Sequence, residues 1–184
     1  MVYGFETGDR PTLDEVLNTR ENRAGFQHLL LNKFPGHPVI SFKLNIPGPV
    51  KNNEAIRQIF RIGQEDILAQ LNAHRLDICY QKTLDLPTGP ELFLVVEAQP
   101  WALKKAMTIL EEETPLGRLY DIDVLHEEEG EQKSVSRTQL GLPSRRCLVC
   151  EKDAKVCGRS RAHTMDEMHE EIIKMMNNER RLKI

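Results

Sequence analysis

Two aspartates, Asp121 and Asp123, lie two positions apart in the stretch TPLGRLYDIDVLHEEEG. The apolar residues around them predict a β-strand over roughly 119–125, and successive side chains of a strand alternate between its two faces. Both carboxylates should therefore lie on one face. There they can bind Mg²⁺, which holds polyphosphate oxygens during phosphoryl or nucleotidyl transfer. The alternative is a solvated strand face, because most acidic side chains are exposed.

The loop PGPVKNNE joins a strand to a helix and offers groups that suit an anion. Gly48 lets the backbone approach a ligand closely, Lys51 carries a positive charge, and the start of the next helix has free N–H groups. If the strand before this loop pairs with the aspartate strand, the loop lies near Gly117 and Arg118. We then expect a phosphate cradle of Gly48, Lys51 and Arg118 beside the aspartates. The alternative is an ordinary Pro-Gly turn with a solvated lysine.

Three cysteines and a histidine follow at a metal-binding spacing, Cys147-x2-Cys150-x6-Cys157-x5-His163. Thiolates and imidazole nitrogens are the ligands of tetrahedral zinc sites, and a C-x2-C pair is their usual first half. This set predicts a structural Zn²⁺ that orders the surrounding segment. The alternative is three reduced, partly buried cysteines in a loop. The remaining cysteine, Cys79, has no histidine near it in sequence, which argues against a cysteine nucleophile.

The same segment is rich in arginine, whose guanidinium group suits phosphate and carboxylate partners. No P-loop, dinucleotide-binding glycine pattern or serine elbow accompanies it. The alternative is that these arginines only cap and solvate the surface. The residues that we expect to bind substrate here are Arg145, Arg146, Arg159 and Arg161.

The hydrophobic pattern predicts the elements that position these residues. A capping box at Thr12 and Glu15 starts a helix over 12–33. The residues at helical spacing in it are Leu13, Val16, Leu17, Ala24 and Leu31. Beyond it we expect strand, helix, strand, strand, helix and strand, at 40–46, 56–71, 76–86, 91–98, 99–115 and 119–125. The unbroken apolar run 92–96 predicts a central strand that is buried on both faces.

This order is that of ferredoxin-like domains. We expect an α+β fold with a βαββαβ core over 39–125, a four-stranded antiparallel sheet with helices on one face. Its first and third strands should be central, its last strand should lie beside the first, and the N-terminal helix should pack outside this unit. The Cys/Arg-rich segment 126–163 should be irregular. A capping box at Thr164 and Glu167 starts a C-terminal helix over 164–180, so that 1–184 form a single domain.

The composition of the 184 residues excludes several classes of protein. A net charge of −3 leaves no basic excess for non-specific nucleic-acid binding, and 5% aromatic residues are too few for a base-stacking surface. No apolar run is long enough for a membrane span, and the N-terminus lacks a secretion signal. We therefore expect a cytoplasmic protein without nucleic-acid or membrane partners, whose cysteines are thiols or metal ligands.

Three blocks of the sequence, in their order and separation, resemble the citrate lyase holo-acyl carrier protein synthase family, formally apo-citrate lyase phosphoribosyl-dephospho-CoA transferases. The blocks are PGPVKNNEAIRQIF, PLGRLYDIDVL and LPSRRCLVCEKDAKVCGRSRAH. The resemblance covers roughly residues 12–175. The positions that match the family's acidic motif, basic loop and cysteine block are Gly117, Arg118, Asp121 and Asp123, then Gly48, Pro49 and Lys51, and then Cys147, Cys150, Cys157 and His163.

The resemblance implies a nucleotidyltransferase. Members transfer a prosthetic group from 2′-(5″-triphosphoribosyl)-3′-dephospho-CoA to a serine of the citrate lyase acyl carrier protein (gamma) subunit, and pyrophosphate leaves. This donor implies Mg²⁺ at Asp121 and Asp123, with Arg118 as a further catalytic residue. Two alternatives remain. One is the same chemistry on another carrier, of the malonate decarboxylase type, and the other is a non-catalytic ferredoxin-like module that binds a nucleotide or a carrier.

The sequence does not assign two roles in this reaction to a particular residue. His126, just past the aspartate strand, is a candidate general base for the acceptor serine by position alone. A third metal-binding carboxylate is also unassigned, with Glu97 and Asp77 as unranked candidates.

Overall fold

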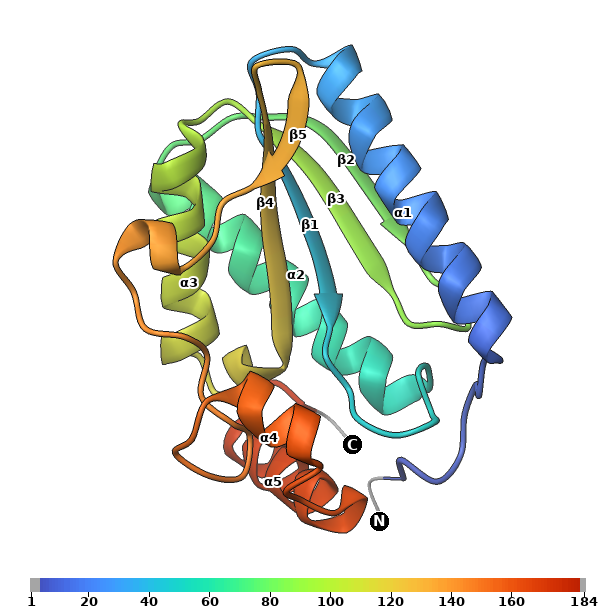
Figure 1. The fold of residues 1–184 in the computed structure, drawn as a ribbon. Helices are drawn as coiled ribbons and strands as arrows, with labels where there is room; N and C mark the ends of the chain where they lie inside the picture. Colours follow the sequence, from blue (N-terminus) through green and yellow to red (C-terminus); the bar gives the residue numbers. More distant parts are fainter. Residues whose placement is uncertain (1–3, 183–184) are drawn as a thin grey trace.

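The computed structural model describes residues 4–182, which form an α+β fold (Figure 1). In these residues one antiparallel sheet has the strand order β2-β3-β1-β4-β5. Its strands are β1 (Val39–Leu44), β2 (Ile78–Leu84), β3 (Glu91–Val96), β4 (Tyr120–Glu128) and β5 (Glu131–Ser134). The helices are α1 (Leu13–Lys33), α2 (Glu54–Ala73), α3 (Pro100–Glu113), α4 (Ala154–Ser160) and α5 (Met165–Asn178), with 3₁₀ turns η1 (Gly117–Leu119) and η2 (Thr138–Leu140).

Helices cover both faces of the sheet (Figure 1). α2 and α3 share the larger core with the strand residues that face them, such as Phe42, Leu94 and Ile122. α1 packs on the opposite face, where Leu30 and Leu31 form a smaller core with strand residues. All six residues of β3 are buried, which confirms the prediction of a central strand covered on both sides.

The strand count differs from the four strands that the sequence predicted. The expected order of strands and helices from β1 to β4 is present, but β5 adds a fifth strand that pairs with the end of β4. Glu129 and Gly130 form the turn between them with φ of 55° and 80°. The residues of β5, Glu-Gln-Lys-Ser, are all polar, and three of the four are exposed. Such an edge strand has no apolar alternation for a sequence pattern to detect.

The segment predicted to be irregular, 126–163, also contains a short helix, α4. Asp153 caps its N-terminus by accepting hydrogen bonds from two backbone N–H groups. With seven residues and no apolar stripe, this helix leaves no periodic signal in the sequence. The C-terminal helix α5 begins where the sequence placed it, with the predicted capping box at Thr164 and Glu167.

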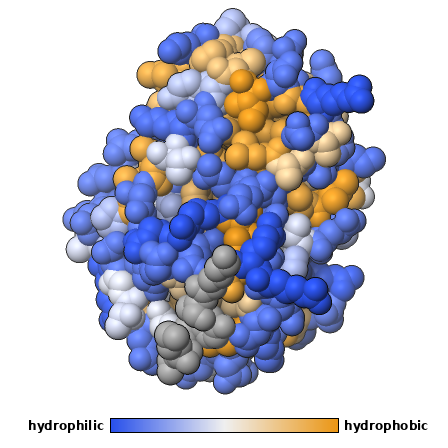
Figure 2. Space-filling view, turned by 180° about the vertical axis from the view of Figure 1, so that it is seen from behind, coloured by the Kyte–Doolittle hydropathy of each residue, from blue (hydrophilic) through white to orange (hydrophobic). Residues whose placement is uncertain are grey.

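The apolar stripe predicted for α1 is buried only at its C-terminal end, where Leu31 packs against the sheet. Its capping box is present, but Leu13 and Leu17 are 72% and 44% exposed. Further along α1, Arg23 and Gln27 form side-chain hydrogen bonds to residues of the sheet. The first turns of α1 therefore extend past the sheet into solvent. Among residues 4–182 no helix is both long enough and apolar enough to cross a membrane. From behind, the surface is mostly hydrophilic with separate apolar patches (Figure 2).

Candidate active site

Asp121 and Asp123 lie on the same face of β4, as the alternation of strand side chains predicted. Their neighbours across the β1–β4 pairing are Lys43, opposite Asp121, and Ser41, opposite Asp123. The Lys43 ammonium forms an ion pair with the Asp121 carboxylate. Both aspartates are half-buried. This face is the one that α1 partly covers, since Gln27 of α1 donates a hydrogen bond to the Ser41 hydroxyl at 2.9 Å.

Lys43 is the centre of a row of charges that crosses three strands. In the strand register it lies opposite Glu91 of β3 on one side and opposite Asp121 of β4 on the other. Arg23 of α1 closes the row, with two hydrogen bonds of 2.8 and 2.5 Å to Glu91. Burial lowers the pKa of the Lys43 ammonium, and the nearby Asp123 carboxylate opposes this shift. Lys43 was not predicted as a site residue, although it is one of the polar positions of the predicted strand 40–46.

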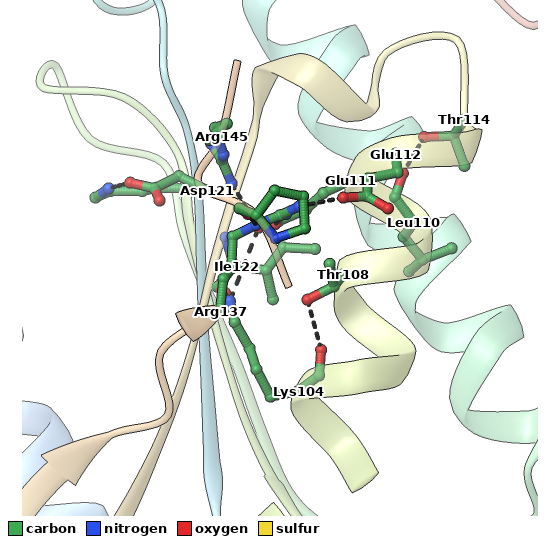
Figure 3. Close-up of polar contacts among 12 residues, drawn as sticks. Lys104, Thr108, Leu110, Glu111, Glu112, Thr114, Asp121, Ile122, Arg137 and Arg145 are labelled. Carbon is green, nitrogen blue, oxygen red and sulfur yellow. Dashed lines mark hydrogen bonds and ion pairs between the residues drawn. The ribbon is translucent and has the colours of Figure 1, made fainter. Parts of the chain in front are cut away.

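The backbone between the two aspartates is held by α3 (Figure 3). Lys104 donates a hydrogen bond to the Ile122 carbonyl at 2.5 Å, and the Ile122 N–H donates to Glu111 at 3.2 Å. β5 pairs with β4 only from Leu125 onward, so these two side chains take the place of a neighbouring strand. They therefore fix the stretch of β4 that presents the carboxylates.

Glu111 joins this strand to the arginine-rich segment (Figure 3). Its side chain is only 2% exposed and contacts Arg145 at 2.7 Å and Arg137 at 3.2 Å. Lys104 and Glu111 were not predicted as site residues. The available signal was their spacing of two helical turns, which places both on the side of the helix that carries its buried apolar residues.

A cavity of about 590 Å³ lies at the end of β1. It is bounded by η1, by residues 145–163, here called the cysteine segment, and by the start of α5. Four of its lining residues are arginines, and in the described part of the chain no carboxylate lines it. They are Arg118, Arg145, Arg146 and Arg161. Apolar side chains make up another part of the wall, namely Pro47, Leu148, Met165 and Met168. Arg159, also predicted to bind substrate, is exposed on α4 and does not line this cavity.

Arg118 attaches the cysteine segment to the start of β4. Its guanidinium donates a hydrogen bond to the Cys147 carbonyl at 2.7 Å and another to the Arg146 carbonyl. Among the described residues its buried Nε has no hydrogen-bond partner. Gly117 packs beneath the end of α3, where a Cβ atom would lie 2.3 Å from the Leu110 carbonyl oxygen. The glycine therefore allows this close approach between η1 and α3.

The predicted cradle of Gly48, Lys51 and Arg118 is not one cavity in this structure. Lys51 donates to the Ile46 carbonyl at 2.7 Å and lines a second cavity, of about 130 Å³, together with Lys43 and Arg23. Arg118 lines the larger cavity, and Asn45 lines both.

Gly48 has the positive φ, 92°, that glycine readily adopts. A Cβ atom there would lie 3.3 Å from His169 of α5. The loop PGPVKNNE therefore packs against α5, at the rim of the larger cavity. Contact of Lys51 and Arg118 with a polyphosphate stays a prediction.

Three further candidates lie away from the aspartates. His126 is an odd number of positions from both, so it lies on the opposite face of β4, with its ring 5.5 Å from that of Trp101. The backbone N–H of Glu97 donates a hydrogen bond to the Asp77 carbonyl, at the end of the sheet where β1 begins. Asp121 lies opposite Lys43, near the end of β1. By register, Glu91 of β3 lies opposite Lys43, on the same face of the sheet as the aspartates.

The four predicted zinc ligands converge in the structure. The ligand atoms of Cys147, Cys150, Cys157 and His163 all lie within 4.8 Å of one another. Cys79, by contrast, is exposed on the edge strand β2. The cluster forms part of the wall of the larger cavity, through Cys147, Cys157 and His163.

Comparison with known proteins places nearly all of the chain in one group. Residues 11–179 match a protein family described as apo-citrate lyase phosphoribosyl-dephospho-CoA transferase. A Streptococcus pyogenes protein named "Probable apo-citrate lyase phosphoribosyl-dephospho-CoA transferase" is 39% identical over 174 residues, 95% of this chain and 90% of the relative. A Citrobacter koseri protein of the same name without "Probable" is 39% identical over 157 residues, 85% and 84% of the two chains. A Shigella boydii protein, again of that name, is 38% identical over 167 residues, 91% and 89%.

Proposed function

Because the chain belongs to the apo-citrate lyase phosphoribosyl-dephospho-CoA transferase family, we propose that it attaches the prosthetic group of citrate lyase. The donor is 2′-(5″-triphosphoribosyl)-3′-dephospho-CoA, and the acceptor is a serine of the acyl carrier protein subunit. The serine Oγ forms a bond to the phosphorus next to the donor ribose. The bond from this phosphorus to its bridging oxygen breaks, and pyrophosphate leaves with the electron pair. The serine proton goes to a base or to water, and the product is a phosphodiester.

The observation that carries this proposal is the arginine-lined cavity beside the aspartate strand. Four guanidinium groups without a carboxylate among the described lining residues suit a polyanion. Arg145 and Arg146 are partly neutralised by Glu111 and Glu151. Arg161 has no ion pair among the described residues. The methionines and Leu148 supply the apolar surface that a nucleoside or pantetheine needs.

The aspartates fit a magnesium ion by their chemistry. Both are half-buried oxygen ligands on one strand face, and Mg²⁺ binds through one or two carboxylates together with substrate phosphates. Asp121 and Asp123 would hold the ion, which offsets the charge that develops on the leaving pyrophosphate. Lys43 neutralises Asp121 and thereby keeps two close carboxylates compatible on one face. Glu91, which is bound to Arg23, extends the same charge row.

The arginines orient the donor and stabilise its phosphates. Arg118 lies three residues before Asp121 and lines the cavity, so a phosphate held there is close to the strand that carries the aspartates. Arg145 reaches the same cavity while its guanidinium is fixed by buried Glu111. A cation held in place in this way costs little reorganisation when charge develops in the transition state.

Release of pyrophosphate tests the proposed reaction. The purified protein should release pyrophosphate when the triphosphoribosyl donor, Mg²⁺ and the apo-carrier are all present. It should release none with a carrier whose acceptor serine is replaced by alanine. A non-catalytic binding module would release none under either condition.

The identity of the acceptor is tested by exchanging one carrier protein for another. The protein should modify the citrate lyase carrier faster than a malonate decarboxylase-type carrier in otherwise identical assays. A preference for the second carrier would keep the chemistry and change the acceptor.

We also propose a ferredoxin-like core for this enzyme. The four strands β2, β3, β1 and β4 with α2 and α3 support it, and β5 and α1 are additions to that core. A cytoplasmic location is part of the same proposal, supported by four cysteines of which none forms a disulfide.

A further inference from the structure

The cysteine segment brings four side chains that bind soft metals to one point. Cys150 Sγ lies 3.5 Å from Cys157 Sγ and 3.3 Å from His163 Nε2. A disulfide needs sulfur atoms about 2.05 Å apart, so these thiols are in contact and not bonded. A tetrahedral zinc with Zn–S of about 2.3 Å and Zn–N of about 2.0 Å holds neighbouring ligand atoms about 3.5–3.8 Å apart. The two separations at Cys150 are close to those values, and all four ligand atoms lie within 4.8 Å of one another.

The ligands come from different parts of a folded segment. Cys147 and Cys150 lie in a loop closed by hydrogen bonds from Cys147 N–H to the Lys152 carbonyl and from Ala154 N–H to the Arg145 carbonyl, at 2.7 and 2.9 Å. Cys157 lies on α4, and His163 lies between α4 and α5. One ion would therefore join the loop, α4 and the start of α5.

Burial of apolar side chains contributes little to holding this segment together. In the described part of the chain, the stretch 136–171 buries a single side chain, that of Cys157. Segments that bury so little apolar surface do not order themselves by the hydrophobic effect, and small structural units often use a metal instead.

We propose that Cys147, Cys150, Cys157 and His163 bind one structural Zn²⁺. Three thiolates and one imidazole form a complete tetrahedral set, which leaves no open position for a reacting water. The ion is therefore structural and separate from the Mg²⁺ proposed at the aspartates. It fixes one wall of the arginine-lined cavity, because three of the ligands line that cavity. It also fixes the position of the Cys147 carbonyl, which accepts a hydrogen bond from Arg118.

Metal content tests this proposal directly. The protein, purified without a metal-affinity column, should contain about one zinc per chain by elemental analysis. Cobalt added in place of zinc should give the strong visible absorption of a tetrahedral thiolate site. Metal-free protein with three titratable thiols in this segment, or with a Cys150–Cys157 disulfide, would overturn the proposal.

Matched variants separate metal binding from a general effect of losing a thiol. Cys150→Ser should lose the zinc, whereas Cys79→Ser, at an exposed cysteine of β2, should keep it. His163→Cys supplies another ligand that zinc accepts and should keep the ion, whereas His163→Ala should bind it more weakly. Equal zinc content in Cys150→Ser and wild type would contradict the assignment. If a variant is insoluble, the zinc content of the wild-type protein still decides.

Limited proteolysis tests the structural role. A chelator should expose sites within 136–163 to protease while the sheet stays resistant. Unchanged cleavage after complete removal of zinc would show that the ion does not hold the segment. Zinc content and protease protection are measured without donor or carrier, so a failed transferase assay leaves both results valid.

Discussion

The aspartates and the arginines of the candidate site belong to two regions that are held together in different ways. The sheet that carries Asp121 and Asp123 is packed between helices on both faces. The segment that carries Arg145, Arg146 and Arg161 buries one side chain among the described residues 136–171. It is held by ion pairs, helix caps and, as we propose, a zinc ion.

The contrast implies different responses to substitution. On the sheet, a charged side chain can be changed while the apolar core keeps the backbone in place. In the segment, loss of one ion pair, helix cap or metal ligand is expected to displace several arginines together. Glu111 is the point where the two regions meet, because it holds both the Ile122 backbone and Arg145.

The largest effect is expected at that meeting point. Glu111→Ala leaves Lys104, Arg137 and Arg145 without their buried partner and should lower the free energy of unfolding by about 3–5 kcal/mol. The matched control is Glu112→Ala, since Glu112 is 49% exposed and, within residues 4–182, forms an ion pair with Arg137 alone. Its cost should be at most about 1 kcal/mol. Chemical denaturation measures both, and equal values would remove the special role of Glu111.

The aspartates should show the opposite behaviour, with a loss of rate and little loss of stability. Asp121→Asn and Asp123→Asn should each slow transfer by about a hundredfold, the scale for removing one electrostatic stabiliser. Unfolding free energies should change by no more than about 1 kcal/mol, because both side chains are half-exposed. Steady-state kinetics and denaturation together check this. Near-normal rates in both variants would leave only the solvated strand face.

The arginines offer a matched pair within one helical turn. Arg161→Ala should weaken donor binding by about tenfold or more, since a hydrogen bond to a charged group contributes about 1.5–3 kcal/mol. Arg159→Ala should change it little, because Arg159 lies outside the cavity. Donor titration by calorimetry distinguishes the two.

A Lys51 variant tests whether the donor also occupies the smaller cavity. If Lys51→Ala also weakens donor binding, the donor reaches across Asn45 into the smaller cavity. No change would confine the donor to the larger one.

A smaller effect is expected at Lys43. Lys43→Met removes a cation that competes with Mg²⁺ for Asp121, so half-maximal activity should require several-fold less magnesium. Magnesium titration at saturating donor measures this. An unchanged or higher requirement would mean that Lys43 does not compete for the metal-binding carboxylate.

The fold was predictable where the hydrophobic pattern is strong. The order from β1 to β4 and the burial of β3 follow from alternating or continuous apolar runs. The polar strand β5 and the short helix α4 have no such pattern. The exposed Leu13 and Leu17 show a different limit, because an apolar residue at helical spacing is buried only where the helix meets the sheet.

The site was predictable to the extent that it depends on local spacing. A two-residue interval places Asp121 and Asp123 on one face, and the short intervals between the cysteines and His163 allow them to converge. Lys43 and Glu111 reach the site through strand pairing and helix packing between distant parts of the chain. Those contacts carry no local sequence signal, and the split between the Lys51 and Arg118 cavities has the same origin.

Attachment of the prosthetic group can be measured as an increase in the mass of the citrate lyase acyl carrier protein. The apo-carrier is incubated with the triphosphoribosyl donor, Mg²⁺ and either the wild-type protein or the Asp121→Asn, Asp123→Asn double variant. The wild type should increase the intact mass by one phosphoribosyl-dephospho-CoA group, located on a serine by peptide mapping, while the double variant should leave the carrier unmodified over the same time. An unmodified carrier after incubation with folded wild-type protein, or equal modification by the double variant, would contradict the proposed reaction.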